Sequence, residues 1–158
     1  MRLITLNGVK LIVYQNGMIL RYSEKNGNKI TKGWNVLNHH ILNSYKEVRF
    51  NKKHFKLHRI LAYSFLSLDY DDKSCVVDHI DQNKQNNTLD NLRIISQQEN
   101  GFNTKSKGYS WDKNAQKFSA QIHLNGIKIR LGMFETKEEA HDAYLKAKVK
   151  YHIIRPKI

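Results

Sequence analysis

One segment of the sequence, residues 77–100, gathers residue types that together could hydrolyse a phosphodiester. It reads V-D-H-I-D-Q-N-K-Q-N-N-T-L-D-N-L-R-I-I-S-Q-Q-E-N, with a histidine, carboxylates and several amides. Because a phosphodiester is an anion, its hydrolysis needs a base to make hydroxide from water and a cation to neutralise charge on the phosphorus oxygens. An imidazole suits the first task, since its ordinary pKa of about 6.5 leaves much of it neutral at cell pH. Carboxylate and amide oxygens suit Mg²⁺ better than Zn²⁺.

The local pattern predicts that a strand, a loop, a strand and a helix carry these residues. Residues 75–77 are β-prone and lead into Asp78 and His79, and residues 92–95 are a second β-prone run, so two short strands flank a loop rich in Asn and Asp. Ser96 and Glu99 have the spacing of a capping box. This spacing predicts a helix from about residue 97 into the region of Phe102.

The order of these elements and their residues resemble the HNH (ββα-metal) nuclease family. The resemblance is closest to the phage- and intron-encoded homing endonucleases, whose pattern is D-H-x-D-x-N-x-x-N-N-x-x-x-N-L followed by a helix that carries Asn. It implies that His79 is the general base, that the Asn91 carbonyl accepts its N–H and orients it, and that Asp78 and Asn100 bind the metal. The implied cofactor is Mg²⁺, with Mn²⁺ able to substitute, and the implied products have 5′-phosphate and 3′-hydroxyl ends.

Single residues of such a loop have a simpler interpretation. Asn-rich loops are commonly just turns, because Asn tolerates the left-handed conformation and bonds its own backbone. We assign Asp81, Asn83, Asn86 and Asn87 mainly to shaping the loop, with DNA contact as a second possibility. The nuclease hypothesis therefore depends on the joint spacing of the motif.

Residues 107–158 predict a sheet covered by a helix. Residues 117–124 alternate apolar and polar side chains, Asn125-Gly126 is a type I′ hairpin signature, and the apolar residues at 127, 129 and 131 resume the apolar face. Thr136 and Glu139 form a capping box before a predicted helix of about four turns, which should cover the apolar side. The polar side is left open to meet a groove.

This region resembles the Apetala/ethylene-response-factor DNA-binding domain, a three-stranded sheet and helix that is also found appended to homing endonucleases. The matching framework positions are Trp111, Gly126, Leu131, Gly132, Phe134, Glu139, Ala140, Ala143 and Tyr144. The resemblance implies that the sheet enters the major groove. The first strand has Tyr109, Ser110 and Trp111 in place of the usual arginines, so no base preference is implied. Packing is as good an interpretation of Trp111 as DNA contact.

The N-terminal third predicts strands at 9–14, 18–22 and 47–50, with a turn at 15–17. A helix is predicted from the apolar stripe Leu57, Ile60, Leu61, Phe65 and Leu68, in a run that looks like the helix before the catalytic unit of the same homing endonucleases. We interpret His39-His40 as loop, and His58 as either a packing residue or a phosphate contact.

The predicted DNA-binding side chains lie in all three parts of the chain: Arg59, Lys84, Arg93, Lys113, Lys117, Gln121, His123, Lys128 and Arg130. The formal net charge is +13, with 27 basic and 14 acidic residues, which favours a polyanionic partner. Residues 71–106 carry 4 basic and 6 acidic side chains, whereas 1–70 carry 12 and 3, and 107–158 carry 11 and 5. Two basic arms should hold the duplex around a catalytic centre that keeps carboxylates for a metal.

We therefore expect an α+β chain with an N-terminal arm (1–70), a catalytic unit (71–106) and a DNA-binding domain (107–158). The single cysteine, Cys75, excludes an intramolecular disulfide and a Cys-rich zinc clamp. No signal peptide or transmembrane run is recognisable, so we expect a soluble, intracellular protein, in the host cytoplasm or nucleoid if phage- or virus-encoded. The expected partner is double-stranded DNA, bound by a monomer that nicks one strand. The alternatives are a DNA-binding regulator with an inactive nuclease unit, and an RNA-binding or RNA-cleaving protein.

Overall fold

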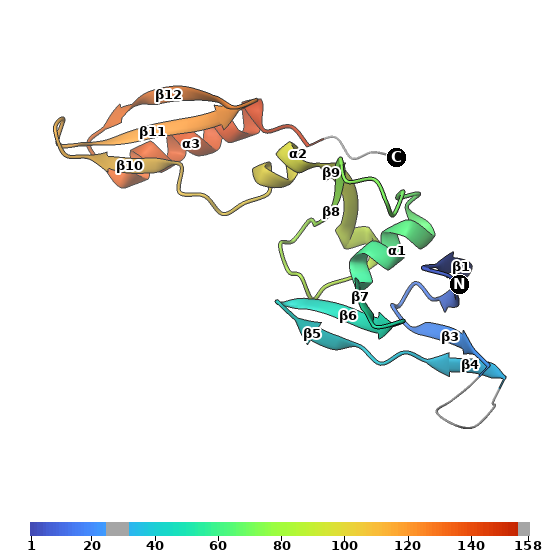
Figure 1. Cartoon of the computed structure of the whole chain (residues 1–158). Helices are drawn as coiled ribbons and strands as arrows, with labels where there is room; N and C mark the ends of the chain where they lie inside the picture. The colour runs from blue at the N-terminus through green and yellow to red at the C-terminus, as the bar shows by residue number, and fades with distance from the viewer. Residues whose placement is uncertain (25–31, 155–158) are drawn as a thin grey trace. The chain divides into compact units, whose positions relative to one another are not determined.

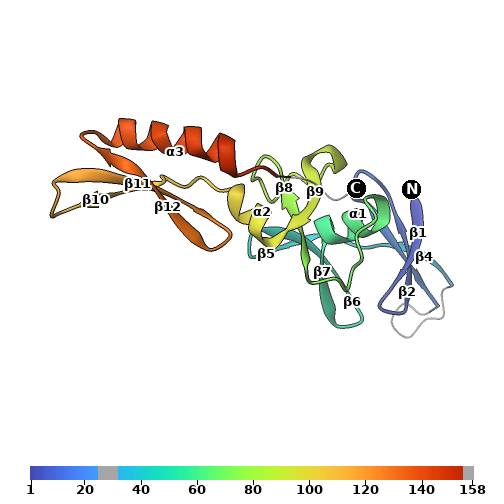
Figure 2. The same cartoon turned by 90° about the horizontal axis from the view of Figure 1, so that it is seen from above.

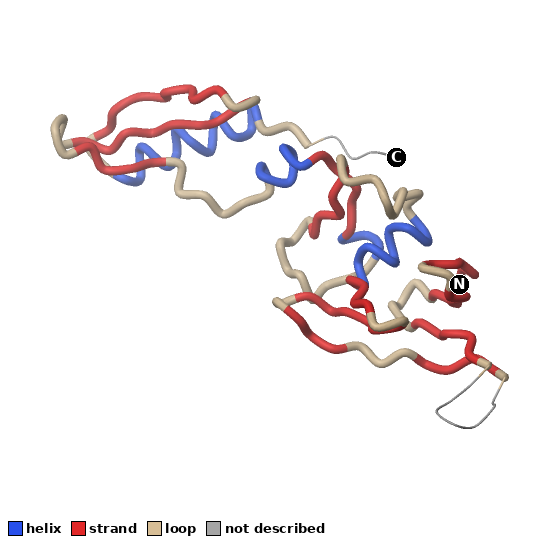
Figure 3. Tube along the Cα trace, in the orientation of Figure 1, coloured by secondary structure: helices blue, strands red, loops and turns tan. Residues whose placement is uncertain are grey.

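The described residues form twelve short strands, arranged in four small sheets, and three α-helices (Figure 1, Figure 3). The computed structural model describes residues 1–24 and 32–154. It divides into two units, residues 1–95 and the described residues from 96 onward, and each unit is described by itself. The predicted α+β class is confirmed.

The chain begins with a four-stranded sheet in the order β1-β2-β3-β4. Its strands are β1 (Arg2–Leu6), β2 (Val9–Val13), β3 (Ile19–Ser23) and β4 (Gly33–Val36). The strands predicted at 9–14 and 18–22 are confirmed as β2 and β3, whereas β1 and β4 were not predicted. The β1–β2 turn is Asn7-Gly8, with φ of 49° and 75°, the left-handed pair that an Asn-Gly turn favours.

A second sheet has the order β5-β6-β7, from β5 (His40–Leu42), β6 (Tyr45–Phe50) and β7 (Lys53–Lys56). The predicted strand at 47–50 is confirmed and begins two residues earlier. The interpretation of His40 as loop was wrong, because His40 opens β5 and pairs with Glu47 across the sheet. The two-residue turn after β5 uses Asn43 and Ser44 at φ of 49° and 68°.

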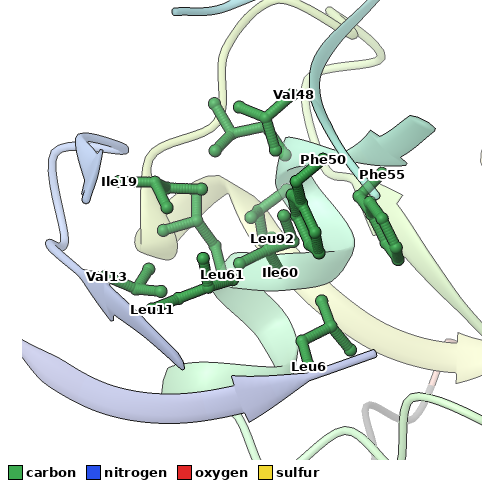
Figure 4. Packing of buried hydrophobic residues seen from close by; sticks show 11 residues of the cluster. Leu6, Leu11, Val13, Ile19, Val48, Phe50, Phe55, Ile60, Leu61 and Leu92 are labelled. Atoms are coloured by element: carbon green, nitrogen blue, oxygen red, sulfur yellow. The ribbon is translucent and has the colours of Figure 1, made fainter. Parts of the chain in front are cut away.

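Helix α1 (Leu57–Phe65) is the centre of the first unit's core. One side of α1 packs on side chains of both sheets and on Leu92 (Figure 4); the buried residues are Leu6, Leu11, Val13, Ile19, Val48, Phe50, Phe55, Leu57, Ile60, Leu61 and Leu92. Ala62 joins a second cluster with Leu68, Cys75 and Ile94. Leu68 was predicted within the helix stripe. The helix instead ends at Phe65, and Leu68 reaches the core from the loop beyond Ser67, whose φ is 61°.

Strands β8 (Cys75–His79) and β9 (Leu92–Ser96) form a two-stranded sheet, with the 3₁₀ turn η1 (Leu89–Asn91) before β9. The predicted strand, loop and strand are confirmed, and Asp78 and His79 are the last two residues of β8. Since β9 contributes Leu92, its first residue, to the core on α1, this core holds the start of β9 in place. Helix α2 (Gln97–Phe102) follows with both bonds of the Ser96–Glu99 capping box, as predicted.

In the second unit, β10 (Tyr109–Asp112), β11 (Lys117–Leu124) and β12 (Ile127–Phe134) form a sheet in that order. Helix α3 (Lys137–Tyr151) covers one face of it (Figure 2), and Ile122, Tyr144 and Ala147 are buried between them. The hairpin, the Thr136–Glu139 capping box and the covering helix are confirmed. Ile127 was predicted on the apolar face, but it sits beside the turn and is 67% exposed.

No helix within residues 1–24 and 32–154 is long and apolar enough to span a membrane.

Candidate active site

Asp78 and His79 are buried neighbours at the end of β8. Successive side chains of a strand point to opposite faces, so the two residues meet different partners. Asp78 meets β9, and His79 meets the loop between β8 and η1 together with side chains from α1 and β6.

The Asp78 carboxylate forms an ion pair with Arg93 on β9. Arg93 donates from Nη2 and Nε to the same oxygen, Oδ2, at 2.7 and 2.8 Å, and the two side chains are only 17% and 8% exposed. A buried carboxylate is costly unless a partner compensates its charge, which gives this arginine a structural reason to face inward. Arg93 was also predicted as a DNA contact; in the structure it pairs with Asp78, and the DNA contact stays a prediction.

The His79 imidazole is held by Asn87, a contact that the sequence analysis did not predict. Nε2 of His79 lies 3.1 Å from Oδ1 of Asn87. The Asn87 Nδ2 donates to the backbone carbonyl of Gln85 at 3.1 Å, which fixes the orientation of the amide. Oδ1 can only accept, so the proton of a neutral imidazole sits on Nε2 and the basic lone pair on Nδ1.

Asn91 holds the loop together on its buried side. Its Oδ1 accepts from the backbone N–H of Asp81 at 3.0 Å, and its Nδ2 donates to Asp81 Oδ1 at 2.9 Å and to the Asn86 carbonyl at 2.8 Å. Its own carbonyl accepts from the N–H of Ile80, the residue after His79, at 2.9 Å. The predicted direct bond from Asn91 to the imidazole stays a prediction, whereas Asn87 makes that kind of contact.

Asp81 is the ionised acceptor around which the loop closes. The Asn86 side chain, together with the Asn83 backbone and Asn91, holds the pKa of the Asp81 carboxyl below its usual range. The loop-shaping role predicted for Asp81, Asn83 and Asn86 agrees with these bonds.

Aromatic side chains support the other side of His79. The ring of His58 from α1 lies 5.0 Å from that of His79 in an edge-on arrangement, and Tyr45 from β6 lies 5.0 Å from His58 and 6.3 Å from His79. Burial, reinforced by the nearby His79, Lys56 and Arg59, lowers the pKa of His58 to about 3. His58 is therefore a neutral packing residue, and its burial argues against the phosphate contact considered from the sequence.

Besides Arg93, two further predicted DNA contacts lie near this site. Lys84 is exposed, with Nζ 4.8 Å from the Tyr45 ring centre. Arg59 donates to the backbone carbonyl of Tyr70 at 2.8 Å and lies against the Tyr70 ring, so it connects α1 to the following loop.

Asn100, predicted as a metal ligand, is an exposed residue of α2 in the second unit.

The uncovered face of the C-terminal sheet presents the other predicted contacts. Gln121 pairs with Arg130 and His123 with Lys128, which confirms their predicted juxtaposition. A shallow cavity of about 280 Å³ lies on this face; its lining residues are Ser110, Trp111, Asp112, Ser119, Gln121, Lys128, Arg130, Gly132 and Met133. Lys113 is exposed in the β10–β11 turn. Lys117 pairs with Glu135 at 2.7 Å, an exposed ion pair that a phosphate can displace.

Comparisons with known proteins relate part of this chain to HNH endonucleases. Residues 56–102 match the model of the HNH endonuclease family. The chain is 33% identical over 102 residues to the uncharacterized HNH endonuclease L560 of Acanthamoeba polyphaga mimivirus, covering 61% of this chain and 53% of that protein. It is 28% identical over 90 residues to Protein 3.8 of Escherichia phage T7, covering 46% of this chain and 74% of that protein.

The solved structure of the HNH homing endonuclease I-HmuI aligns with a TM-score of 0.47 and 25% identity, over 100% of this chain and 99% of that one. The match of residues 56–102 to the HNH endonuclease family agrees with the nuclease class predicted from the sequence. The chain spans about half the length of the mimivirus relative.

Proposed function

We propose that this chain is a metal-dependent DNA endonuclease of the homing type, with His79 as its general base. The observation that carries the proposal is the pairing of His79 with Asn87 within an HNH segment. This contact supports a neutral imidazole with its proton on Nε2 and its basic lone pair on Nδ1. Proton removal from water by such a group contributes typically 10²- to 10⁴-fold to a hydrolysis rate.

Asp78 and Asn100 would hold the metal ion, Mg²⁺ or in its place Mn²⁺. When bound, the ion would supply positive charge that stabilises the developing negative charge on the phosphate and the leaving 3′ oxygen. The oxygen donors of these two residues fit such a hard cation. On the Asp78 side, the metal would have to share the carboxylate with Arg93 or displace it. The Asn100 side rests on the sequence motif.

Double-stranded DNA is the proposed substrate, cut to 5′-phosphate and 3′-hydroxyl ends. The support is the net charge of +13 and the row of Gln121, His123, Lys128 and Arg130 on a sheet face that α3 does not cover. We propose that this sheet is an Apetala/ethylene-response-factor-like module that enters the major groove. With one His79 per chain, a monomer would nick one strand.

The test is cleavage of supercoiled DNA by the wild type and Asp78→Asn in Mg²⁺, Mn²⁺ and a chelator, with strand-resolved mapping of the ends. The proposal predicts nicked circles with 3′-hydroxyl ends in either metal, none with chelator, and a loss of at least 100-fold in Asp78→Asn. Cleavage that persists in chelator would contradict it. Competition with duplex RNA belongs in the same assay, because a sheet that reads a major groove cannot read the A-form helix.

A second candidate function is a DNA-binding regulator in which the HNH segment is inactive. The ion pair of Asp78 with Arg93 favours it, because Arg93 already neutralises the carboxylate that a metal would need. Wild-type protein that binds DNA but leaves it intact, together with an Arg93→Ala variant that cuts, would support the regulator.

A further inference from the structure

A group of metal-ligand side chains lies on the β5–β6–β7 sheet, outside the HNH segment. We propose that His40, Glu47 and His54 form a Zn²⁺ site that joins the three strands. The three residues come one from each strand: β5, β6 and β7.

The strand register places the three side chains on one face. His40 pairs with Glu47, and His54 pairs with Arg49, which is two residues from Glu47 on the same strand and therefore on the same face. The opposite face of β6 and β7 carries Val48 and Phe55, which belong to the core on α1. The sheet thus has an apolar side against the core and a side with three metal-ligand residues.

The distances among the ligand atoms suit one small cation. His40 Nε2 lies 3.0 Å from His54 Nδ1, and His54 Nδ1 lies 3.4 Å from Glu47 Oε2. All three atoms lie within 4.8 Å of one another. Ligands bound tetrahedrally at about 2.0–2.2 Å from Zn²⁺ are separated by about 3.3–3.6 Å. Small side-chain rotations bring the set to that geometry.

Hydrogen bonding alone leaves this arrangement unsatisfied. His54 Nδ1 faces both His40 Nε2 and Glu47 Oε2, yet one ring nitrogen carries either a proton or a lone pair. If Nδ1 accepts from His40, its lone pair also faces a carboxylate. If it donates to Glu47, it has no lone pair left to accept from His40 Nε2, which can then only share the same proton. A cation that accepts all three lone pairs removes the conflict.

The burial of Glu47 is a separate observation that points to a ligand. Its side chain is 6% exposed, whereas His54 is 43% exposed, so the carboxylate lies beneath the histidines. Among the described residues, Glu47 Oε2 is a buried oxygen without a hydrogen-bond partner. The cross-strand neighbour Lys56 lies with Nζ 4.4 Å from the centre of the Tyr45 ring. An anionic oxygen in such a place needs a cation close by.

Two imidazoles and one carboxylate are a donor set that Zn²⁺ accepts, with a fourth position left for water. The oxygen-rich set proposed around Asp78 suits Mg²⁺ instead, so the two sites differ in chemistry. A metal on β5–β7 would fix the register of the short β5 strand and the start of β6. Tyr45, which supports His58 and His79, is the first residue of β6. The inference does not depend on the nuclease proposal.

The experiment measures zinc in the full chain after equilibration with Zn²⁺ and exhaustive dialysis, together with thermal unfolding and the visible spectrum of the Co²⁺ form. The variants are Glu47→Gln and the double variant His40→Ala/His54→Ala. Exposed His39 next to the site gives the control His39→Ala, and Asp78→Asn excludes zinc at the HNH site. Circular dichroism of every variant checks that it is folded.

We expect about one zinc per chain in wild type, His39→Ala and Asp78→Asn, and at least a tenfold loss of affinity in both site variants. Saturating Zn²⁺ should raise the unfolding temperature of the wild type by about 5–10 °C at a hundredfold excess over Kd, and that of the site variants far less. Zinc binding that is equal in wild type and Glu47→Gln, or absent from the wild type, would overturn the site. DNA cleavage is not among these readouts. If the protein fails to cut DNA, the zinc result is therefore unaffected.

Discussion

At the scale of single residues, the site joins three asparagines with different tasks around one histidine. Asn87 contacts the imidazole, Asn91 closes the loop from its buried side, and Asn86 bonds the exposed carboxylate of Asp81. From the sequence, Asn91 was predicted to orient the imidazole and Asn87 to shape the loop. Spacing along the chain does not tell which of several amides points inward. The adjacent pair Asn86-Asn87 could have pointed to this contact, because the two side chains point in different directions in the turn.

Replacing Asn87 tests its role in positioning the base. Asn87→Ala removes the acceptor of the Nε2–H and leaves the tautomer undefined, so we expect a 10- to 100-fold slower cleavage with unchanged DNA affinity. Asn87→Asp keeps the acceptor but adds a charge that favours the protonated imidazole, so its acidic limb of the pH–rate profile should move to higher pH. Asn83→Ala, an exposed asparagine of the same loop, is the control. Equal rates in Asn87→Ala and Asn83→Ala would exclude the role.

The buried His58 predicts acid sensitivity. Its pKa is about 3 in the folded chain and 6.5 when unfolded, so the unfolded state takes up the proton first as the pH falls. The neutral side chain's stabilising effect is complete above pH 6.5 and is lost progressively toward pH 3. The loss approaches about 1.4 kcal/mol per pH unit, or about 1.5 kcal/mol between pH 6.5 and 5.

The measurement is the free energy of unfolding against pH in wild type, His58→Leu and His123→Gln. The slope should flatten in His58→Leu and persist in His123→Gln, which alters an exposed histidine. A His58→Leu variant with the wild-type slope would show that other groups cause the acid sensitivity.

At the scale of elements, the sequence predicted those helix starts and turns that depend on a few neighbouring residues. The capping boxes at Ser96 and Thr136 and the Asn125-Gly126 turn fix their elements within a few residues, and all three were predictable. Asn7-Gly8 carries the same turn signal and could have revealed β1. Strand β5 has three residues, and its pairing with β6 depends on tertiary contacts, so no pattern in the sequence announces it.

The packing of α3 on its sheet gives a prediction for Gly108. A Cβ at Gly108 would lie 1.9 Å from Cγ of Tyr144, and its φ is 71°. Gly126 has a similar φ of 77°, but nothing lies within 4 Å of its Cβ position. Gly126→Ala should therefore cost about 1 kcal/mol from backbone strain. Gly108→Ala should cost about 1–3 kcal/mol more from overpacking.

Hydrogen exchange of the α3 amides in the two variants measures this difference. Faster exchange in Gly108→Ala than in Gly126→Ala is the expected result. Equal protection would mean that Tyr144 moves aside without cost.

At the scale of the whole molecule, charge determines how DNA is bound. If the chain neutralises six to ten phosphates, its affinity should fall by about 10³- to 10⁵-fold between 50 and 200 mM salt. Lys128→Ala/Arg130→Ala should reduce the slope of log K against log salt by about two. Lys146→Ala is the matched control, because that lysine pairs with Asp142 on α3. A slope unchanged in the double variant would remove the C-terminal sheet from the DNA interface.

The central claim is that His79 is the base of a DNA-cleaving site, and one assay tests it most directly. Wild type and His79→Ala are compared for Mg²⁺-dependent cleavage of supercoiled DNA and, in parallel, for DNA affinity. The account predicts that the wild type nicks DNA and that His79→Ala binds it equally well but cuts it at least 100-fold more slowly. A His79→Ala variant that cuts at the wild-type rate would contradict the account.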